Sequence, residues 1–256
     1  MKRMIAFCML AFIAAQSTCL AAEKAADPER IFYEANAAYE KGDYAKAVQE
    51  YARITGKGFE SGNLYFNIGN SFFKLGKLGL AILNYERARR FIPRDSDLKS
   101  NLGYAQGTAD DPFNRAPEQN FLIRLLMVPF RSFNMTTLTV FSTAVYLIIV
   151  AMFLVFIMNP ERAKKAKPAL VILLVIGFYT VVAFGFKYYE EEVLTYGVVI
   201  QKEVEARYEP IDKATTFYKL REGSLVVVLK EKGGWKQIRR LDGKIAWVKD
   251  DAVEDI

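Results

Sequence analysis

Two long uncharged stretches constrain the fold more than any other feature of this sequence. Residues 132–160 contain no Asp, Glu, Lys or Arg, and their apolar centre covers 135–158. After a short charged segment, residues 169–186 are again uncharged. Helices of these lengths, at about 1.5 Å per residue, span about 36 Å and about 27 Å, comparable with a hydrocarbon layer of about 30 Å. The sequence therefore predicts two transmembrane helices, at 135–158 and 169–187.

Two further segments predict an orientation in the membrane: the short connection between the two uncharged stretches, and the start of the chain. Residues 159–168 contain four basic residues, Arg162, Lys164, Lys165 and Lys167. Because Lys and Arg gather on the cytoplasmic side of a membrane, we expect 159–168 to be a cytoplasmic loop. Residues 1–22 have a basic start, a short apolar run and two closing alanines, as a secretory signal peptide does. Both features predict periplasmic N- and C-terminal domains on a bacterial inner (cytoplasmic) membrane.

The residues available for chemistry are few. The sequence has no histidine, and its two cysteines, Cys8 and Cys19, lie in the predicted signal peptide. Cleavage removes both, unless Cys19 is the lipid acceptor of a lipoprotein leader. A chain without them has no Ser-His-Asp or Cys-His catalysis, no His-ligated zinc and no disulfide framework. The carboxylates Glu203 and Glu205 alternate along a predicted strand in a solvated region, so we expect no enzyme, no catalytic residue, no metal and no cofactor.

The basic excess of the chain lies beside its apolar stretches. The formal net charge is +6, and residues 121–189 carry seven positive charges against one negative charge. This distribution is typical of a membrane protein, whereas a nucleic-acid-binding protein carries basic residues on a folded domain. We therefore expect contact with the lipid bilayer and none with nucleic acid. Because the uncharged stretches offer no charged residue for an ion or proton path, they predict an anchor and not a transporter.

Two basic segments near the spans each have two interpretations. Residues 109–134 form a linker, in which 121–131 is either an interfacial helix or an ordinary apolar connection. Four arginines lie at the end of a predicted helix: Arg87, Arg89, Arg90 and Arg94. They either complement the negative end of the helix dipole or contact anionic lipid headgroups. The sequence leaves these alternatives open.

Residues 29–106 repeat with a period of thirty-four residues. The pairs that carry the repeat are Asn36 and Asn70, Gly42 and Gly76, Ala47 and Ala81, and Tyr51 and Tyr85. Thirty-four residues is the period of tetratricopeptide repeats, which are helix-turn-helix pairs. We expect two such repeats and a capping helix over 29–108. Glycines 42 and 76 then lie in turns that favour a left-handed residue, while Gly69 and the two alanines lie where helices approach closely.

The concave face of such a helical array is a candidate binding surface, because repeats of this kind hold extended segments there. By resemblance to tetratricopeptide domains, Asn36 and Asn70 occupy a groove position that hydrogen-bonds the backbone of a bound peptide. The predicted peptide- or protein-binding residues are Asn36, Tyr39, Phe66, Asn70, Phe73 and Lys74. The alternative remains open that both asparagines are internally satisfied amides.

The C-terminal part has the pattern of a small β structure. Segments rich in Val, Ile and Trp occur at 196–200, 225–230, 235–240 and 244–248, and glycine-containing turns separate the later ones. Their order resembles a bacterial SH3 domain, which predicts a five-stranded barrel over 193–256. Ala246 stands where that family usually has glycine. Trp235 and Trp247 are either contacts for a ligand or members of the barrel core.

The predicted fold class is therefore multidomain: an all-α tetratricopeptide helical repeat, a two-helix transmembrane hairpin and a small all-β SH3-like barrel. With residues 64–70 and 81–88, this order resembles the aerotolerance-operon proteins of the BatE type. The resemblance implies a membrane-anchored scaffold beside a MoxR-type AAA ATPase and von Willebrand-A-domain membrane proteins, acting in envelope stress. A second interpretation is a cell-wall sensor that binds peptidoglycan through the SH3 domain.

Overall fold

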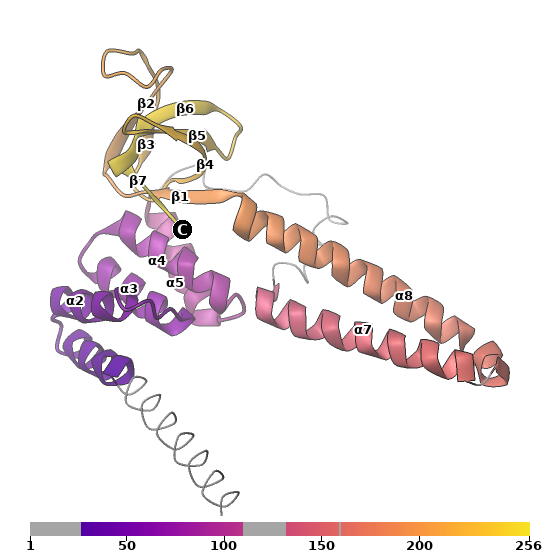
Figure 1. Cartoon of the computed structure of the whole chain (residues 1–256). Coiled ribbons are helices and arrows are strands. Elements are labelled where there is room, and N and C mark those ends of the chain that lie inside the picture. Colours follow the sequence, from indigo (N-terminus) through magenta and orange to yellow (C-terminus); the bar gives the residue numbers. More distant parts are fainter. Residues whose placement is uncertain (1–26, 110–131, 159) are drawn as a thin grey trace, which may run out of the picture.

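The computed structural model describes residues 27–109, 132–158 and 160–256, which form a helical part, a helix hairpin and a β-sheet (Figure 1). The predicted signal peptide and nearly all of the predicted linker lie outside the described residues. A first helix covers 27–40. It is followed by α2 (Tyr44–Thr55), α3 (Gly62–Lys74), α4 (Leu78–Phe91) and α5 (Ser96–Ala109).

The boundaries of these helices follow from local sequence. Asp43, Ser61 and Asp95 each stand before a helix and accept a hydrogen bond from a backbone N–H of its first turn. Gly42 and Gly76 have φ values of +79° and +71°, so the left-handed conformation predicted for both is confirmed. A Cβ atom at either position would meet nothing within 4 Å, and backbone conformation alone therefore favours glycine there.

The helical core repeats every thirty-four residues, as the sequence does. Ala47 and Ala81 are fully buried, and the rings of Tyr51 and Tyr85 are 1% exposed. A Cβ atom on Gly69 would lie 2.6 Å from the Tyr85 ring, so the predicted close approach at this glycine is an approach to a side chain. Helices α3 and α4 pack along their length around these residues.

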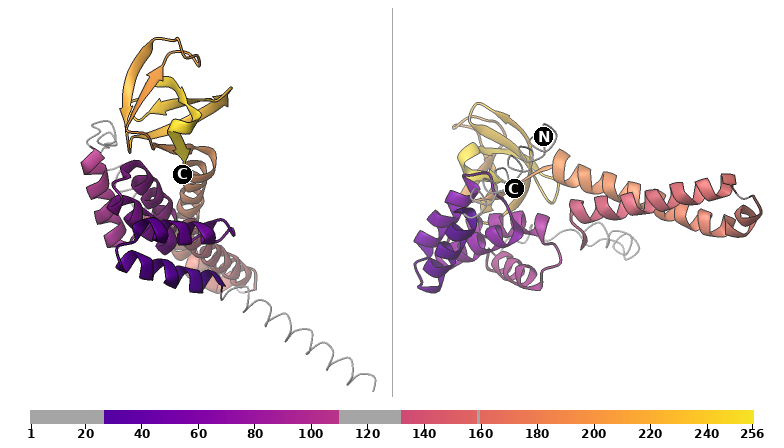
Figure 2. Two further views of the ribbon diagram at one scale, coloured as in Figure 1. Left: turned by 90° about the vertical axis from the view of Figure 1, so that its left-hand side faces the viewer. Right: turned by 60° about the horizontal axis from the view of Figure 1, so that its bottom comes forward.

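Helices α7 (Met135–Met158) and α8 (Pro160–Tyr188) lie side by side as a hairpin that projects from the rest of the molecule (Figures 1 and 2). Both are long and apolar enough to cross a membrane, and little of either is buried. The two predicted spans are thus confirmed as helices. The segment expected to be a loop, 159–168, is helical from Pro160 onward, because its Ala, Lys, Arg and Glu residues are good helix formers.

Seven antiparallel strands make up the C-terminal part. They are β1 (Thr195–Val199), β2 (Glu203–Arg207), β3 (Thr216–Arg221), β4 (Leu225–Lys232), β5 (Trp235–Arg240), β6 (Ile245–Lys249) and β7 (Val253–Asp255). Their order in the sheet is β3-β2-β6-β5-β4-β1-β7. A π-helical turn, Tyr189–Val193, connects α8 directly to β1.

The predicted fold class is wrong in two respects. The sheet has seven strands in one continuous order and is not a five-stranded SH3-like barrel. The helices are also not an independent repeat domain, because Val198 of β1 belongs to the helical core and Leu225 and Ile256 pack against it. Treating each apolar pattern as the core of its own domain concealed this shared interior.

Close packing between α4 and the sheet explains why the two parts share a core. A Cβ atom on Gly79 would lie 2.5 Å from the carbonyl oxygen of Val199. Gly223, in the turn before β4 with a φ of +85°, faces the Ile82 side chain, which a Cβ atom would approach to 2.6 Å. A side chain at Gly79 would collide with the backbone of the sheet, and one at Gly223 would displace Ile82, so α4 packs closely against the sheet at both glycines.

Candidate functional site

The two predicted groove asparagines are at the centre of hydrogen-bond networks that repeat after thirty-four residues. The Oδ1 atom of Asn36 accepts from the Tyr51 hydroxyl at 2.5 Å and from Nδ2 of Asn67 at 3.1 Å. The Oδ1 atom of Asn70 accepts from the Tyr85 hydroxyl at 2.8 Å and from Nδ2 of Asn101 at 2.9 Å. Each network joins three helices, so both asparagines have a structural role.

The tyrosines act as donors because their hydroxyls stay protonated. Burial raises the pKa of Tyr51 to about 12 and also raises the pKa of Tyr85. With two donors on its oxygen, Asn70 has its amide NH2 group left for a ligand. Among the described residues, none accepts a hydrogen bond from this NH2 group.

A groove of about 460 Å³ opens beside the second network. Its walls come from the first helix, α3, α4 and α5, and its lining residues are Tyr39, Asn70, Phe73, Lys74, Tyr85, Ser100, Asn101 and Tyr104. Four of the six predicted binding residues, Tyr39, Asn70, Phe73 and Lys74, therefore share one cavity. The other two lie apart from the lining: Asn36 is held in the first network, and Phe66 packs on the Tyr85 ring at 6.0 Å.

Helix α5 supplies groove residues that the sequence analysis missed. Tyr104 is 68% exposed, and its ring meets the Phe73 ring edge-on with 5.7 Å between centroids. The missed signal was the repeat itself. Asn101 follows Asn67 by thirty-four residues, and Tyr104 stands where a third copy would have the asparagine of positions 36 and 70.

The groove has a simple chemical character. Among the described residues that line it, Lys74 alone is charged, and aromatic rings, amides and a serine form the rest. Such a surface suits an extended segment that offers an apolar or aromatic side chain, backbone carbonyls and an acidic group.

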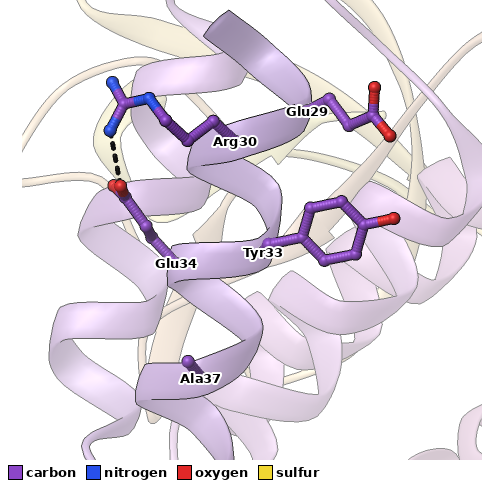
Figure 3. A pocket seen from close by; sticks show the side chains of 5 residues that line it. All are labelled: Glu29, Arg30, Tyr33, Glu34 and Ala37. Atoms are coloured by element: carbon purple, nitrogen blue, oxygen red, sulfur yellow. Dashed lines mark hydrogen bonds and ion pairs between the residues drawn. The ribbon is translucent and has the colours of Figure 1, made fainter. Parts of the chain in front are cut away.

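A second hollow, of about 500 Å³, lies on the outer face of the first helix (Figure 3). All of its lining residues come from that one helix: Glu29, Arg30, Tyr33, Glu34 and Ala37. Arg30 pairs with Glu34 at 2.5 Å, while Tyr33 and Glu29 point to the other side of the helix (Figure 3). These side chains do not converge on a common point, and the hollow has the character of a solvated helix surface.

Trp235 and Trp247, the candidate ligand contacts whose alternative was a place in the core, are buried in the sheet. Trp235 is 7% exposed and Trp247 is 8% exposed, and lysine ammonium groups lie over both rings at 4.6 and 5.4 Å. The accessible aromatic rings of the sheet are instead Tyr208 and Phe217, which stack with centroids 4.5 Å apart. In the part of the chain that the structure describes, no cluster of three or more His, Cys, Asp or Glu residues could hold a metal ion.

Comparisons with known proteins give little further information. No family model matches the sequence, and no curated protein matches it. Among solved structures, NlpC1 from Trichomonas vaginalis is 25% identical over 25% of this chain and 24% of its own, with a TM-score of 0.22. NlpC2 from the same organism is 22% identical over 25% of each chain, with a TM-score of 0.23. The chain thus spans about a quarter of the length of these proteins, and likenesses of this size carry no argument on fold or function.

Proposed function

We propose that this protein is a membrane-anchored scaffold that binds segments of partner proteins in the groove between its first helix and α5. The observation that carries the proposal is the groove itself, because it combines exposed aromatic rings, amide groups and a single cation. Exposed aromatic residues in a concave surface are the usual anchors of protein–protein recognition. The apolar hairpin α7–α8 supplies the anchor.

The orientation that we propose places the groove and the sheet in the periplasm of a bacterium and the start of α8 in the cytoplasm. The basic residues at 162–167 and the signal-like leader support it. Because both cysteines lie in the leader, single cysteines introduced at Lys165 and Lys244 can test it. A membrane-impermeant maleimide should label position 244 in intact spheroplasts and position 165 only after lysis. The reverse pattern would contradict the orientation.

For the partners, we propose the assembly that the resemblance to BatE-type proteins implies. The scaffold would hold von Willebrand-A-domain membrane proteins and a MoxR-type ATPase together in envelope-stress tolerance. The whole-chain order of leader, helical part, two spans and β part, together with residues 64–70 and 81–88, supports this choice.

Cross-linking in native membranes tests the groove and the partners together. The groove variant is Lys74→Ala with Tyr104→Ala, because both side chains are exposed and neither holds an asparagine network. The matched control is Lys46→Ala with Tyr33→Ala, which removes the same side-chain types from exposed positions outside the groove. A tagged full chain is cross-linked, solubilised and analysed by mass spectrometry.

We expect the wild type and the control to recover the same partner proteins and the groove variant to recover about tenfold less. Equal recovery by all three proteins would contradict the proposal that partners bind in the groove. Recovery of peptidoglycan fragments or cell-wall enzymes in place of the proposed partners would contradict the assembly and favour the sheet as the functional part.

A further inference from the structure

Of the four arginines, three lie in the last turns of α4 and Arg94 follows the helix, and two of those in α4 connect distant parts of the chain. Nη2 of Arg87 donates to Oε1 of Glu254 at 3.1 Å and to the carbonyl oxygen of Asp255 at 2.6 Å. Arg90 donates to the carbonyl oxygens of Ile256 at 3.4 Å and of Glu191 at 3.3 Å. These contacts join α4 to the last strand and to the turn that follows α8, so both guanidinium groups are engaged within the protein.

A third arginine also has an internal partner. Arg89 pairs with Glu86 at 2.6 Å, and the Glu86 side chain is 1% exposed. Burial raises the pKa of Glu86, which Arg89 partly offsets, and Gln106 donates a further hydrogen bond to this carboxylate. The Arg89 side chain thus serves to neutralise a buried acid.

Arg94 differs from the other three. Its side chain is exposed, and its guanidinium carbon lies 3.8 Å from the centroid of the Phe133 ring. Among the described residues, no carboxylate lies within ion-pair distance of Arg94. The adjacent acid, Asp95, accepts a hydrogen bond from the backbone N–H of Leu98 and so caps α5. Asp97, in the first turn of α5, is favoured there by the helix dipole.

The position of Arg94 is fixed at the start of the first span. Asn134 caps α7 by accepting from the backbone N–H of Thr137 at 2.9 Å, and its own Nδ2 donates to the carbonyl oxygen of Phe91 at 2.9 Å. The end of α4 is therefore tied to the residue before Met135, where α7 begins. When α7 crosses a membrane, Phe133 and Arg94 lie at the level of the headgroups, where aromatic residues and cations are favoured.

We infer that Arg94, held over Phe133 in the connection between α4 and α5, binds the phosphate group of an anionic phospholipid. A guanidinium group presents paired N–H donors that match phosphate oxygens, and stacking on Phe133 restricts its orientation. The inference requires that α7 cross the membrane, and it is independent of the groove and its partners. On this inference Arg87, Arg89 and Arg90 stabilise the fold, and Arg94 contacts the lipid.

Native mass spectrometry of the detergent-solubilised full chain tests this inference. Palmitoyl-oleoyl phosphatidylglycerol and phosphatidylcholine are titrated separately, and inorganic phosphate is added as a competitor. The variants are Arg94→Gln, Arg94→Lys and Phe133→Leu. Arg53→Gln is the control, because Arg53 is 54% exposed on α2 and its loss changes the net charge equally. Melting temperatures of all variants are compared first.

A cation near anionic lipid contributes on the order of 1 kcal/mol, so we expect Arg94→Gln to weaken binding of the first phosphatidylglycerol about fivefold. Arg94→Lys, which keeps the charge but loses the paired donors, and Phe133→Leu, which removes the stacking ring, should each have an intermediate effect, and Arg53→Gln should have none. Equal affinity in wild type and Arg94→Gln, or an equal loss in Arg53→Gln, would overturn the inference. Displacement of the lipid by millimolar phosphate would show a general anion site and also overturn it.

Discussion

The side chain of Glu222 caps a helix that lies far from it in the sequence. Its Oε1 atom accepts a hydrogen bond from the backbone N–H of Gly79, in the first turn of α4, at 2.8 Å. The residue before α4, Lys77, makes no side-chain capping bond of its own. A carboxylate at the start of a helix satisfies an otherwise free N–H and complements the helix dipole. A residue of the sheet part thus supplies the N-terminal cap of α4, one of the helices that line the groove.

Replacing Glu222 should therefore loosen α4 from its first turn. We expect Glu222→Ala to destabilise this turn by about 1 kcal/mol, the usual value of a helix cap, and Glu222→Gln to cost less because its amide oxygen still accepts. Hydrogen exchange of the full chain in detergent should show faster exchange at the start of α4 and unchanged exchange in α2. If exchange at the start of α4 were the same in both variants as in the wild type, the contact would contribute nothing to the stability of this turn.

Gly69 and Gly103 occupy equivalent places in the thirty-four-residue repeat but have different surroundings. A Cβ atom on Gly69 would lie 2.6 Å from the buried Tyr85 ring, whereas one on Gly103 would meet nothing within 4 Å. We expect Gly69→Ala to cost about 1–3 kcal/mol through overpacking. Gly103→Ala should gain about 0.5–1 kcal/mol from helix propensity. Thermal melts followed by circular dichroism should shift in opposite directions; shifts of the same sign would contradict the packing described for Gly69.

The thirty-four-residue period predicted much of the helical part correctly, because each repeated residue type has a local physical reason. Glycines 42 and 76 have positive φ, and Ala47 and Ala81 fit only where helices touch. The two apolar helices were equally predictable, since uncharged stretches of this length are rare outside membrane spans. Contacts between distant parts leave no such pattern. Nothing in the local sequence of Glu222 or Arg87 indicates a partner more than a hundred residues away.

The sheet shows a second limit of prediction from sequence. The apolar strands β4, β5 and β6 were found, whereas β3 and β7 were missed as strands because charged residues interrupt β3 and β7 has only three residues. For the two tryptophans the sequence left ligand contact and core membership open, because hydropathy does not distinguish a buried ring from a ring at a binding surface, and the structure shows both rings buried.

The role of Asn70 can be separated from ligand binding by a stability measurement. Asn70→Ala removes the acceptor of the Tyr85 hydroxyl, which is buried, and we expect a cost of about 1–3 kcal/mol. Tyr85→Phe should remove the same bond, so the double variant should cost less than the two single variants added together. Asn63→Ala, at an exposed position of α3, is the control and should be nearly neutral. Additive losses would show that the two side chains act separately.

The buried tyrosines predict a loss of stability at alkaline pH. Burial raises the pKa of Tyr51, Tyr65 and Tyr218 to about 12, above the value of about 10 for an unfolded chain. A group whose pKa is raised by folding contributes stability below its unfolded pKa and loses it as the pH rises through the folded pKa. Each of these tyrosines should therefore steepen the fall in stability between pH 10 and pH 12, by up to about 1.4 kcal/mol per pH unit.

Tyr51→Phe tests this dependence on a single hydroxyl. At pH 7 the variant should be less stable than the wild type by about 1 kcal/mol, because the Asn36 oxygen loses one donor. Between pH 10 and pH 12 the difference should shrink, since only the wild type has a hydroxyl at this position to ionise. Urea unfolding of the full chain in detergent, repeated at pH 7, 10, 11 and 12, measures both quantities. A difference that stays constant over this range would mean that the Tyr51 hydroxyl ionises equally easily in the folded and unfolded chain.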